Sequence, residues 1–295
     1  MTSTDVATTA APGPAVAPAG RTRRGRRFWT PGTVLAAAVL LLVLVAVLAP
    51  GLLTGADPQA TDPLASLQGP SAAHWFGTDQ LGRDLYARVV HGARYSVTIA
   101  ALAVLLAVTL GTLLGLVAGL GGARVDEVVA RTLDLLSAFP SVLLALVLAA
   151  LAGPGTLTLA AAVGVAAAPG FGRVVRRQTL AVRRSDFVRA AVTFGRPRRS
   201  VVAQHVLPHV LTSVLLLASI EVGTALLTVS GLSFVGLGPE RPAPEWGSLL
   251  AEGRDVLALA WWPTVFPGVA VVATILAVTA LGRRLQRVAS TKGTA

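Results

Sequence analysis

Stretches without any charged residue alternate with short polar segments along this chain. An apolar helix of about 20 residues crosses a bilayer and satisfies its own backbone hydrogen bonds. The longest uncharged stretches hold 29 residues between Arg27 and Asp57, 29 between Arg94 and Arg124, 38 between Asp134 and Arg173, and 27 between Asp255 and Arg283. The pattern predicts an all-α, polytopic membrane protein with six transmembrane helices, near residues 33–53, 95–120, 133–152, 156–172, 210–233 and 262–282.

Two of these spans need a further argument. The 38-residue stretch is interpreted as two spans because Gly153-Pro154-Gly155 interrupts it with a tight turn. Glu221 interrupts the fifth span, and an acid inside a membrane is costly and usually faces a cavity or a partner. The sequence leaves three roles open for Glu221: it lines a substrate path, it is neutral and hydrogen-bonded within the bundle, or it lies nearer an interface.

Composition supports the membrane interpretation. Hydrophobic residues make up 54% of the chain, its mean hydropathy is +0.70, and only 13% of its residues are charged. An average soluble domain is about 25% charged. This composition excludes a disordered chain and argues against a water-soluble domain.

The formal net charge of +11 could by itself indicate nucleic acid or an anionic membrane surface. Its distribution decides between them. With the N-terminus in the cytoplasm and six alternating spans, 20 of the 25 Lys and Arg residues fall on the cytoplasmic side. Such an excess is typical of cytoplasmic segments. The charge therefore predicts an orientation with both termini cytoplasmic, and no nucleic-acid partner.

The same pattern divides the chain into three parts. Residues 1–29 are predicted to be a disordered cytoplasmic tail, 30–287 the membrane domain, and 288–295 a second cytoplasmic tail. Within the membrane domain we expect an outer loop at about 54–92 and a cytoplasmic loop at about 173–209.

The sequence shows no catalytic arrangement of residues. The chain has no Cys and one Lys, Lys292, so it cannot build the Gly-rich loop with a following Lys that cradles ATP phosphates. His205 and His209 are four residues apart, but Pro208 disrupts their helix face and no third metal ligand is evident. The sequence predicts neither an enzyme nor a metal site.

The outer loop carries a polar motif between two glycines. Its notable residues are Gly77, Thr78, Asp79, Gly82, Arg83 and Asp84. Asp79, Arg83 and Asp84 are expected to pair. Taken alone, the motif is typical of an ordered surface loop with a salt bridge.

Three glycines four residues apart, Gly111, Gly115 and Gly119, lie in the second span. Residues at this spacing share one helix face, so the glycines predict a groove where another helix approaches closely. The pattern indicates helix packing and says little about chemistry.

The cytoplasmic loop predicts a helix–Gly–helix elbow. Ser185 is expected to cap a short helix over residues 186–194, Gly195 to end it in the left-handed conformation, and Pro197 to open a second helix at its first position. Pro208 then precedes the fifth span. The elbow is either a basic helix on the membrane surface or an element that docks another protein.

A Gly-rich segment, 232–238, follows the fifth span and permits a sharp turn. Beyond it, Trp246, Trp261 and Trp262 are expected to form an interfacial aromatic belt.

With these motifs the sequence resembles a known family, the inner-membrane permeases of ATP-binding-cassette importers for dipeptides, oligopeptides and nickel. Within it, the chain is similar to the second of two paired permeases. The family's inner loop is matched by Arg189-Ala190-Ala191, Gly195 and Val206-Leu207-Pro208, and its outer strings by 77–84 and 232–238. Arg189 stands where the family has Glu.

The resemblance implies a type I importer permease fold in the plasma membrane of a prokaryote. A heterodimer with a second permease would form the path, the inner loop would couple it to two ATPase subunits, and an external binding protein would deliver peptides or nickel. ATP and Mg would bind those partners, with no cofactor on this chain. Glu221, Ser233 and Phe234 are candidates for the path. The alternative is a secondary transporter driven by an ion gradient.

Overall fold

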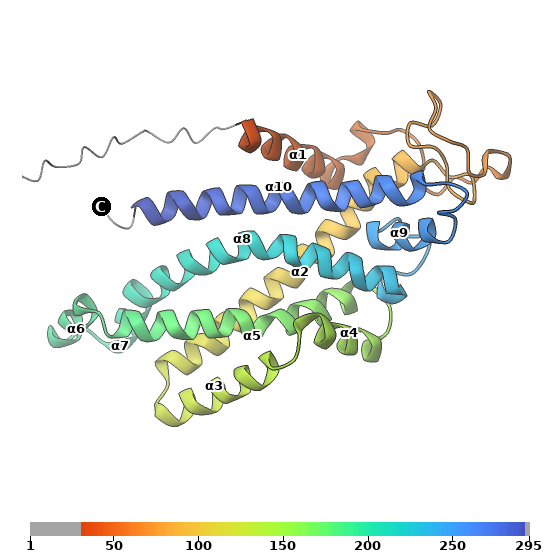
Figure 1. Cartoon of the computed structure of the whole chain (residues 1–295). Coiled ribbons are helices and arrows are strands. Elements are labelled where there is room, and N and C mark those ends of the chain that lie inside the picture. The colour runs from red at the N-terminus through yellow and green to blue at the C-terminus, as the bar shows by residue number, and fades with distance from the viewer. Residues whose placement is uncertain (1–30, 293–295) are drawn as a thin grey trace, which may run out of the picture.

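The computed structural model describes residues 31–292, and the tail expected over residues 1–29 lies outside them. The described chain is a bundle of long helices (Figure 1). The α-helices are α1 Pro31–Leu48, α2 Leu85–Leu120, α3 Ala123–Ser137, α4 Ser141–Ala152, α5 Thr156–Arg183, α6 Asp186–Thr193, α7 Arg198–Val201, α8 Leu207–Leu232, α9 Trp246–Arg254 and α10 Trp262–Lys292. Short 3-10 turns, η1 Pro50–Leu52 and η2 Pro63–Ala65, and π-type turns, η3 Val202–Val206 and η4 Ser233–Leu237, complete the described segments.

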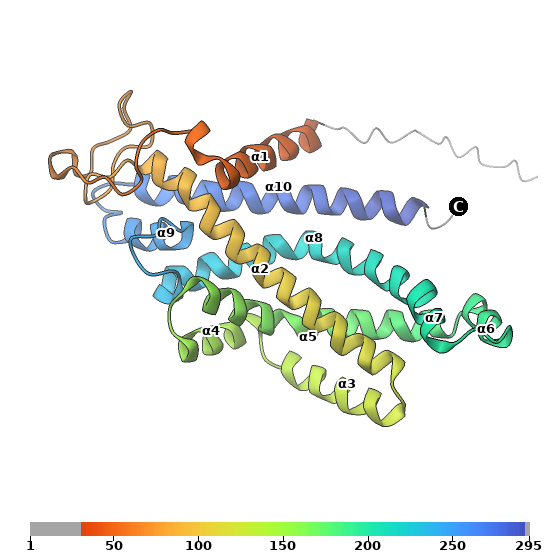
Figure 2. The ribbon, with the colours of Figure 1, turned by 180° about the vertical axis from the view of Figure 1, so that it is seen from behind.

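The bundle has two distinct ends. One end, the elbow end, carries α6 and α7, and α10 finishes there (Figure 1). The other, the loop end, carries α9 and the long segment between α1 and α2. Helices α5, α8 and α10 run lengthwise between the ends, and α2 crosses them obliquely, as seen from behind in Figure 2. The molecule therefore keeps the short polar elements at its two ends and the apolar helices between them.

The glycine face of α2 packs on α5. A Cβ atom added at Gly115 would lie 2.6 Å from Cβ of Val175, and one added at Gly119 would lie 2.6 Å from Cβ of Thr179. At Gly111 the added atom would collide with Cβ of Phe171. Both rows repeat every four residues, so the two helices are in contact along matching faces.

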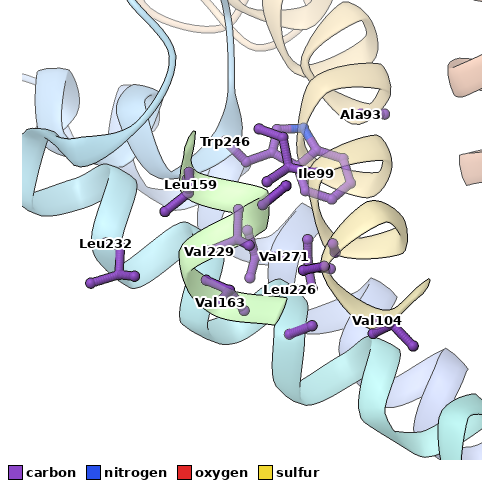
Figure 3. Close-up of a cluster of buried hydrophobic side chains, with 14 of the residues drawn as sticks. Ala93, Ile99, Val104, Leu159, Val163, Leu226, Val229, Leu232, Trp246 and Val271 are labelled. Carbon is purple, nitrogen blue, oxygen red and sulfur yellow. The ribbon is translucent and has the colours of Figure 1, made fainter. Parts of the chain in front are cut away.

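A hydrophobic core takes buried side chains from α1, α2, α4, α5, α8, α9 and α10, and Figure 3 shows part of it. Its labelled side chains come from α2, α5, α8, α9 and α10: Ala93, Ile99, Val104, Leu159, Val163, Leu226, Val229, Leu232, Trp246 and Val271. In contrast, many leucines of α1 face outward, including Leu35, which is 67% exposed. An apolar surface of this kind suits lipid or another membrane subunit.

The third predicted span, 133–152, is not one continuous helix, because residues 138–140 break it. α3 and α4 are joined there with a bend of 87°. Pro140 lacks a backbone donor and disfavours the helical conformation of the residue before it, which accounts for the break. Among residues 31–292, five helices are long and apolar enough to cross a membrane, and the bent pair brings the number to six.

Several helices extend beyond their predicted spans, among them α2 and α5. α2 begins at Leu85 rather than near residue 95, so the outer loop is shorter than expected at about 54–92. α5 continues to Arg183 rather than ending near residue 172. Its additional turns are held at the elbow end, where Arg176 Nε donates to Asp126 of α3 at 2.5 Å and Arg183 donates to the backbone carbonyl of Gly119 at 2.5 Å.

Candidate functional sites

The outer motif folds as a compact loop that depends on its two glycines. Gly77 and Gly82 have φ of +74° and +71°, a region that glycine enters readily and other residues avoid. A Cβ atom at Gly82 would also collide with the carbonyl of Asp62. Thr78 Oγ1 donates to the carbonyl of Ala65 at 2.5 Å and accepts from the backbone of Gln68 at 2.8 Å. The loop is therefore fixed against the preceding segment.

Four charged side chains form a buried cluster, the outer charge cluster, defined as Asp79, Arg83, Arg88 and Glu252. Arg83 Nε lies 2.7 Å from Asp79 Oδ2, and its Nη2 lies 3.1 Å from Glu252 Oε2. Arg88 Nη1 lies 2.6 Å from both acids. The side chain of Arg88 is 1% exposed and that of Asp79 is 6% exposed. Two positive and two negative charges thus balance each other away from water, as buried charges require.

Asp84 does not join this cluster, contrary to the prediction that it pairs with Asp79 and Arg83. It caps α2 instead, with Oδ1 accepting from the backbone of Ala87 at 2.8 Å and Oδ2 lying 2.9 Å from His74 Nδ1. An acid at the start of a helix accepts a hydrogen bond from a free backbone N–H, and its negative charge interacts favourably with the helix dipole. The position explains why α2 begins immediately afterwards.

Sequence reasoning missed Arg88 and Glu252. Arg88 had a detectable signal, since a charged residue beside an apolar helix usually has a partner. Glu252 had none, because it lies 164 residues from Arg88 and only the tertiary fold brings them together.

The sequence predicted that Trp246 belongs to an interfacial aromatic belt, and this is wrong. Trp246 is 2% exposed and lies in the core. Its Nε1 donates to the carbonyl of Val89 at 2.8 Å, and its backbone N donates to Ser96 Oγ at 3.0 Å. The neighbouring Glu245 is fully buried and caps α9 by accepting from the backbone of Ser248 at 2.9 Å. Burial raises the pKa of Glu245, while hydrogen bonds from Ser248 and Ser96 oppose the rise.

A cavity of about 480 Å³ lies in the middle of the bundle, between the α3–α4 break, α5 and α8. We call it the mid-bundle cavity. Its charged lining residues are Glu221 of α8 and Arg173 of α5. Ser137, Phe139 and Ser141 line it from the break. The volume is within the range of small-molecule sites, about 300–1,000 Å³.

Ser233 and Phe234, proposed with Glu221 for a substrate path, do not line this cavity. Ser233 is 2% exposed and lies against Gly247 of α9. Phe234 lies beneath Arg254, whose guanidinium carbon is 5.1 Å from the ring centre. The structure therefore separates these two residues from Glu221 and places them at the loop end.

The cytoplasmic loop forms the expected helix–Gly–helix geometry at the elbow end. Gly195 has φ of +77°, and its N–H donates to the carbonyl of Val192 while that of Arg196 donates to Ala191. These two bonds are the paired C-terminal closure that glycine favours after a helix. Ser185 occupies the N-cap position, but its hydroxyl donates to the carbonyl of Val182 rather than capping α6.

The second helix of the elbow differs from the prediction. Pro197 precedes α7 rather than opening it, and accepts from the backbone of Ser200 at 2.9 Å. Pro208 does not separate this helix from the fifth span, because α7, η3 and α8 follow one another directly and the π-type turn at Val202–Val206 comes just before it. The elbow is therefore joined to the membrane span through continuous helical structure.

The loop motif divides into a buried and an exposed part. Val206 is 1% exposed and packs with Phe171, Val175 and Val210. Leu207 is half-buried, and the exposed members are Arg189, Ala190, Gly195 and Pro208, with Ala191 at the boundary. Arg189 pairs only locally, with Asp186 at 2.5 Å. The motif thus holds the elbow to the bundle at one end and presents α6 at the other.

α6 and its C-cap residue, Phe194, carry exposed apolar side chains at the elbow end. Phe187 is 45% exposed, Val192 is 52% exposed and Phe194 is 86% exposed. An exposed apolar patch on a short helix beside the membrane domain is typical of a surface that another protein covers.

Comparison with known proteins decides between the possible classes. A family model described as "Binding-protein-dependent transport system inner membrane component" matches residues 111–291, which include α5, the elbow and α8. This chain belongs to that family. The resemblance found in the sequence is confirmed, and the membrane interpretation with it.

Curated relatives cover most of the chain. The dipeptide transport system permease of Alkalihalophilus pseudofirmus is 39% identical over 83% of this chain and 80% of its own length. A probable D,D-dipeptide transport system permease of Escherichia coli is 37% identical, covering 86% and 85%. The glutathione transport system permease of Pectobacterium atrosepticum is 35% identical, covering 88% and 87%.

A solved structure supports the fold alone. The crystal structure of an amino acid ABC transporter with histidines matches 68% of this chain and 94% of its own, with a TM-score of 0.54 and 13% identity. The predicted all-α importer permease fold is confirmed, and the chain is a multi-pass membrane protein.

Proposed function

We propose that this chain is one permease subunit of an ATP-driven importer of small peptides. It works with a second permease, two ATPase subunits that bind ATP and Mg, and an external binding protein. Peptides are favoured over nickel because the dipeptide, D,D-dipeptide and glutathione permeases above are each similar to this chain over more than four fifths of its length.

The exposed elbow is the main structural support for this proposal. A chain without an ATP-binding loop needs a contact through which an ATPase moves it, and α6 presents the apolar patch of Phe187, Val192 and Phe194 for that contact. Because α7, η3 and α8 are continuous, a displacement of α6 is transmitted to the span that carries Glu221. Arg189 stands on the same exposed helix and takes the place of the family's Glu in this contact.

The orientation follows from the same element. We place the elbow end in the cytoplasm, which puts the end of α10 there as well (Figure 1). The loop end, with the outer charge cluster and α9, then faces outward toward the binding protein. The N-terminal residues before α1 would lie in the cytoplasm, as the distribution of Lys and Arg predicts.

Reconstituted transport tests the proposal. The chain, its second permease and the two ATPases are placed in liposomes, and uptake of labelled dialanine and trialanine is measured with and without ATP and the binding protein. We expect uptake that needs both, with no effect of 63Ni²⁺ as a competitor. Uptake driven by a proton or sodium gradient without ATP would support the secondary-transporter alternative instead.

A further inference from the structure

The mid-bundle cavity holds one carboxylate and one guanidinium, and neither is paired. Glu221 and Arg173 both line the cavity, from α8 and α5. Neither side chain makes a hydrogen bond or an ion pair with any side chain or backbone group that the structure describes, nor do they pair with each other.

The two groups differ in exposure, since Glu221 is half-buried and Arg173 is exposed. Glu221 lies near the middle of α8, and Arg173 lies inside α5 rather than at its end. A charged side chain within an apolar helix usually faces a cavity or a partner. The surrounding lining does not supply one, because the other cavity residues are apolar side chains, small residues and two serines.

The break between α3 and α4 opens into the same cavity. Ser137, Phe139, Pro140 and Ser141 line it. Non-helical backbone at membrane depth is tolerated only where protein buries it or where it faces water. Broken helices at a bundle's midplane are also a recurring way to build substrate sites in membrane transporters. A carboxylate of α8, a guanidinium of α5 and the break between α3 and α4 thus line one space.

The cavity also continues toward the elbow end. A second cavity of about 460 Å³ shares Gly170, Arg173 and Val174 with it and extends along α3 and α5 to Asp134, Arg176 and Arg177. Arg173 therefore lines both the mid-bundle cavity and this second cavity. This is the position expected for a residue on a route through the bundle rather than in a closed void.

We propose that Glu221 and Arg173 form a zwitterion subsite in the substrate path, in which Glu221 accepts from the free α-ammonium of a small peptide and Arg173 donates to its free α-carboxylate. The inference rests on the proposed function. A molecule with one positive and one negative end pairs with both groups at once, whereas a cation or an anion pairs with only one of them and an apolar solute with neither. No covalent step is involved.

Binding to the assembled complex tests this subsite. The two permeases and two ATPases are placed in lipid nanodiscs without the binding protein, so that its own selectivity does not contribute. Equilibrium dialysis then compares labelled dialanine and trialanine with their N-acetylated forms, which lack the ammonium, and their C-terminal amides, which lack the carboxylate. We expect the unmodified peptides to bind at least about tenfold more tightly, the effect of one charge-assisted hydrogen bond.

Substitutions then assign each end. Glu221→Gln should abolish the preference over the N-acetylated peptides and keep the preference over the amides, and Arg173→Gln should do the reverse. Glu221→Asp and Arg173→Lys should retain both preferences. Glu127→Gln and Arg131→Gln are matched controls, because these residues form an exposed pair on α3 at 2.6 Å and do not line the cavity.

The inference would be overturned if the wild-type complex bound neither dialanine nor trialanine, or if it bound uncapped and capped peptides equally. It would also be overturned if the Gln variants kept both preferences, or if both variants lost all binding. Uptake by the wild-type importer is measured in parallel. If ATP-driven peptide uptake persists without the crossed pattern of preferences, the zwitterion subsite is wrong and the proposed function stands. If the wild type imports no peptide, the proposed function itself is wrong.

Discussion

Arg88 and Glu252 are 164 residues apart in the chain, and Arg88 Nη1 lies 2.6 Å from Glu252 Oε2. The contact joins the first turn of α2 to α9, and Asp79 brings the outer loop into the same cluster. Gln80 adds a further link, since its Nε2 donates to the carbonyl of Glu252 at 2.9 Å. Three segments at the loop end are therefore held together by charges that are shielded from water.

Replacing Arg88 by Met should destabilise the protein strongly. The substitution leaves Asp79 and Glu252 with one guanidinium between them, and removal of one partner from a buried ion pair costs about 3–5 kcal/mol. Thermal unfolding of the permease in nanodiscs measures the effect. Arg131→Gln is the control, because Arg131 is exposed and forms an exposed pair with Glu127 four residues away, so its loss should change stability by less than about 1 kcal/mol.

The double variant Arg88→Met with Glu252→Gln tests whether the two residues act as a pair. It removes one charge of each sign, so it should be less destabilised than the sum of the single variants. Additive losses would show that each side chain acts through separate contacts.

Replacing Gly115 by Ala should separate α2 from α5. The added Cβ would lie 2.6 Å from Cβ of Val175 and 2.7 Å from the backbone carbonyl of Gly172, so a helix must shift. Overpacking of this kind costs about 1–3 kcal/mol. Unfolding in nanodiscs should show the loss, and Val175→Gly should recover part of it. Gly122→Ala is the control, since nothing lies within 4 Å of its added Cβ. Equal stability of both Ala variants would contradict close packing of this face.

The features of the fold that depend on nearby residues in the sequence were predictable. Apolar run length indicated the spans, and the position of Gly195 indicated the end of α6. Pro140 lies inside the predicted third span, yet apolar length alone made that span look continuous. Trp246 was misassigned because an indole at an outer segment suits an interface and a core equally well, and only the contact with Val89 of α2 distinguishes them.

The candidate sites were predictable only in part, for the same reason. Glu221 was recognisable because an acid in an apolar span is rare. Arg173 lies at the border of an uncharged stretch, so the sequence indicated a cytoplasmic residue. The structure shows that α5 continues to Arg183, so Arg173 lies within a helix and not in a connecting loop. Which charges share a cavity depends on the packing of α5 against α8, and no spacing in the sequence contains that information.

Replacing Gly195 by Val should weaken ATPase binding while leaving the membrane domain intact. Gly195 has φ of +77°, and a β-branched residue is strained there by about 1–2 kcal/mol, so the end of α6 should unwind. Nothing lies within 4 Å of its added Cβ, so the effect is conformational rather than a collision. Gly195→Asn is the matched control, because Asn tolerates this conformation. Co-purification with the ATPases should fall for Val and not for Asn.

Replacing Phe194 by Ser should reduce ATPase binding without reducing stability. Phe194 is 86% exposed, so its truncation removes little packing within this chain and should affect only a partner that covers it. Aromatic residues at the centre of an interface commonly contribute about 2 kcal/mol or more, which corresponds to at least tenfold weaker binding. Leu64→Ser is the control, because Leu64 is 93% exposed at the opposite, loop end. Titration of the ATPase against permease nanodiscs measures both variants. If Phe194→Ser binds as tightly as wild type while Leu64→Ser binds weakly, the ATPase docks at the loop end and the proposed orientation is wrong.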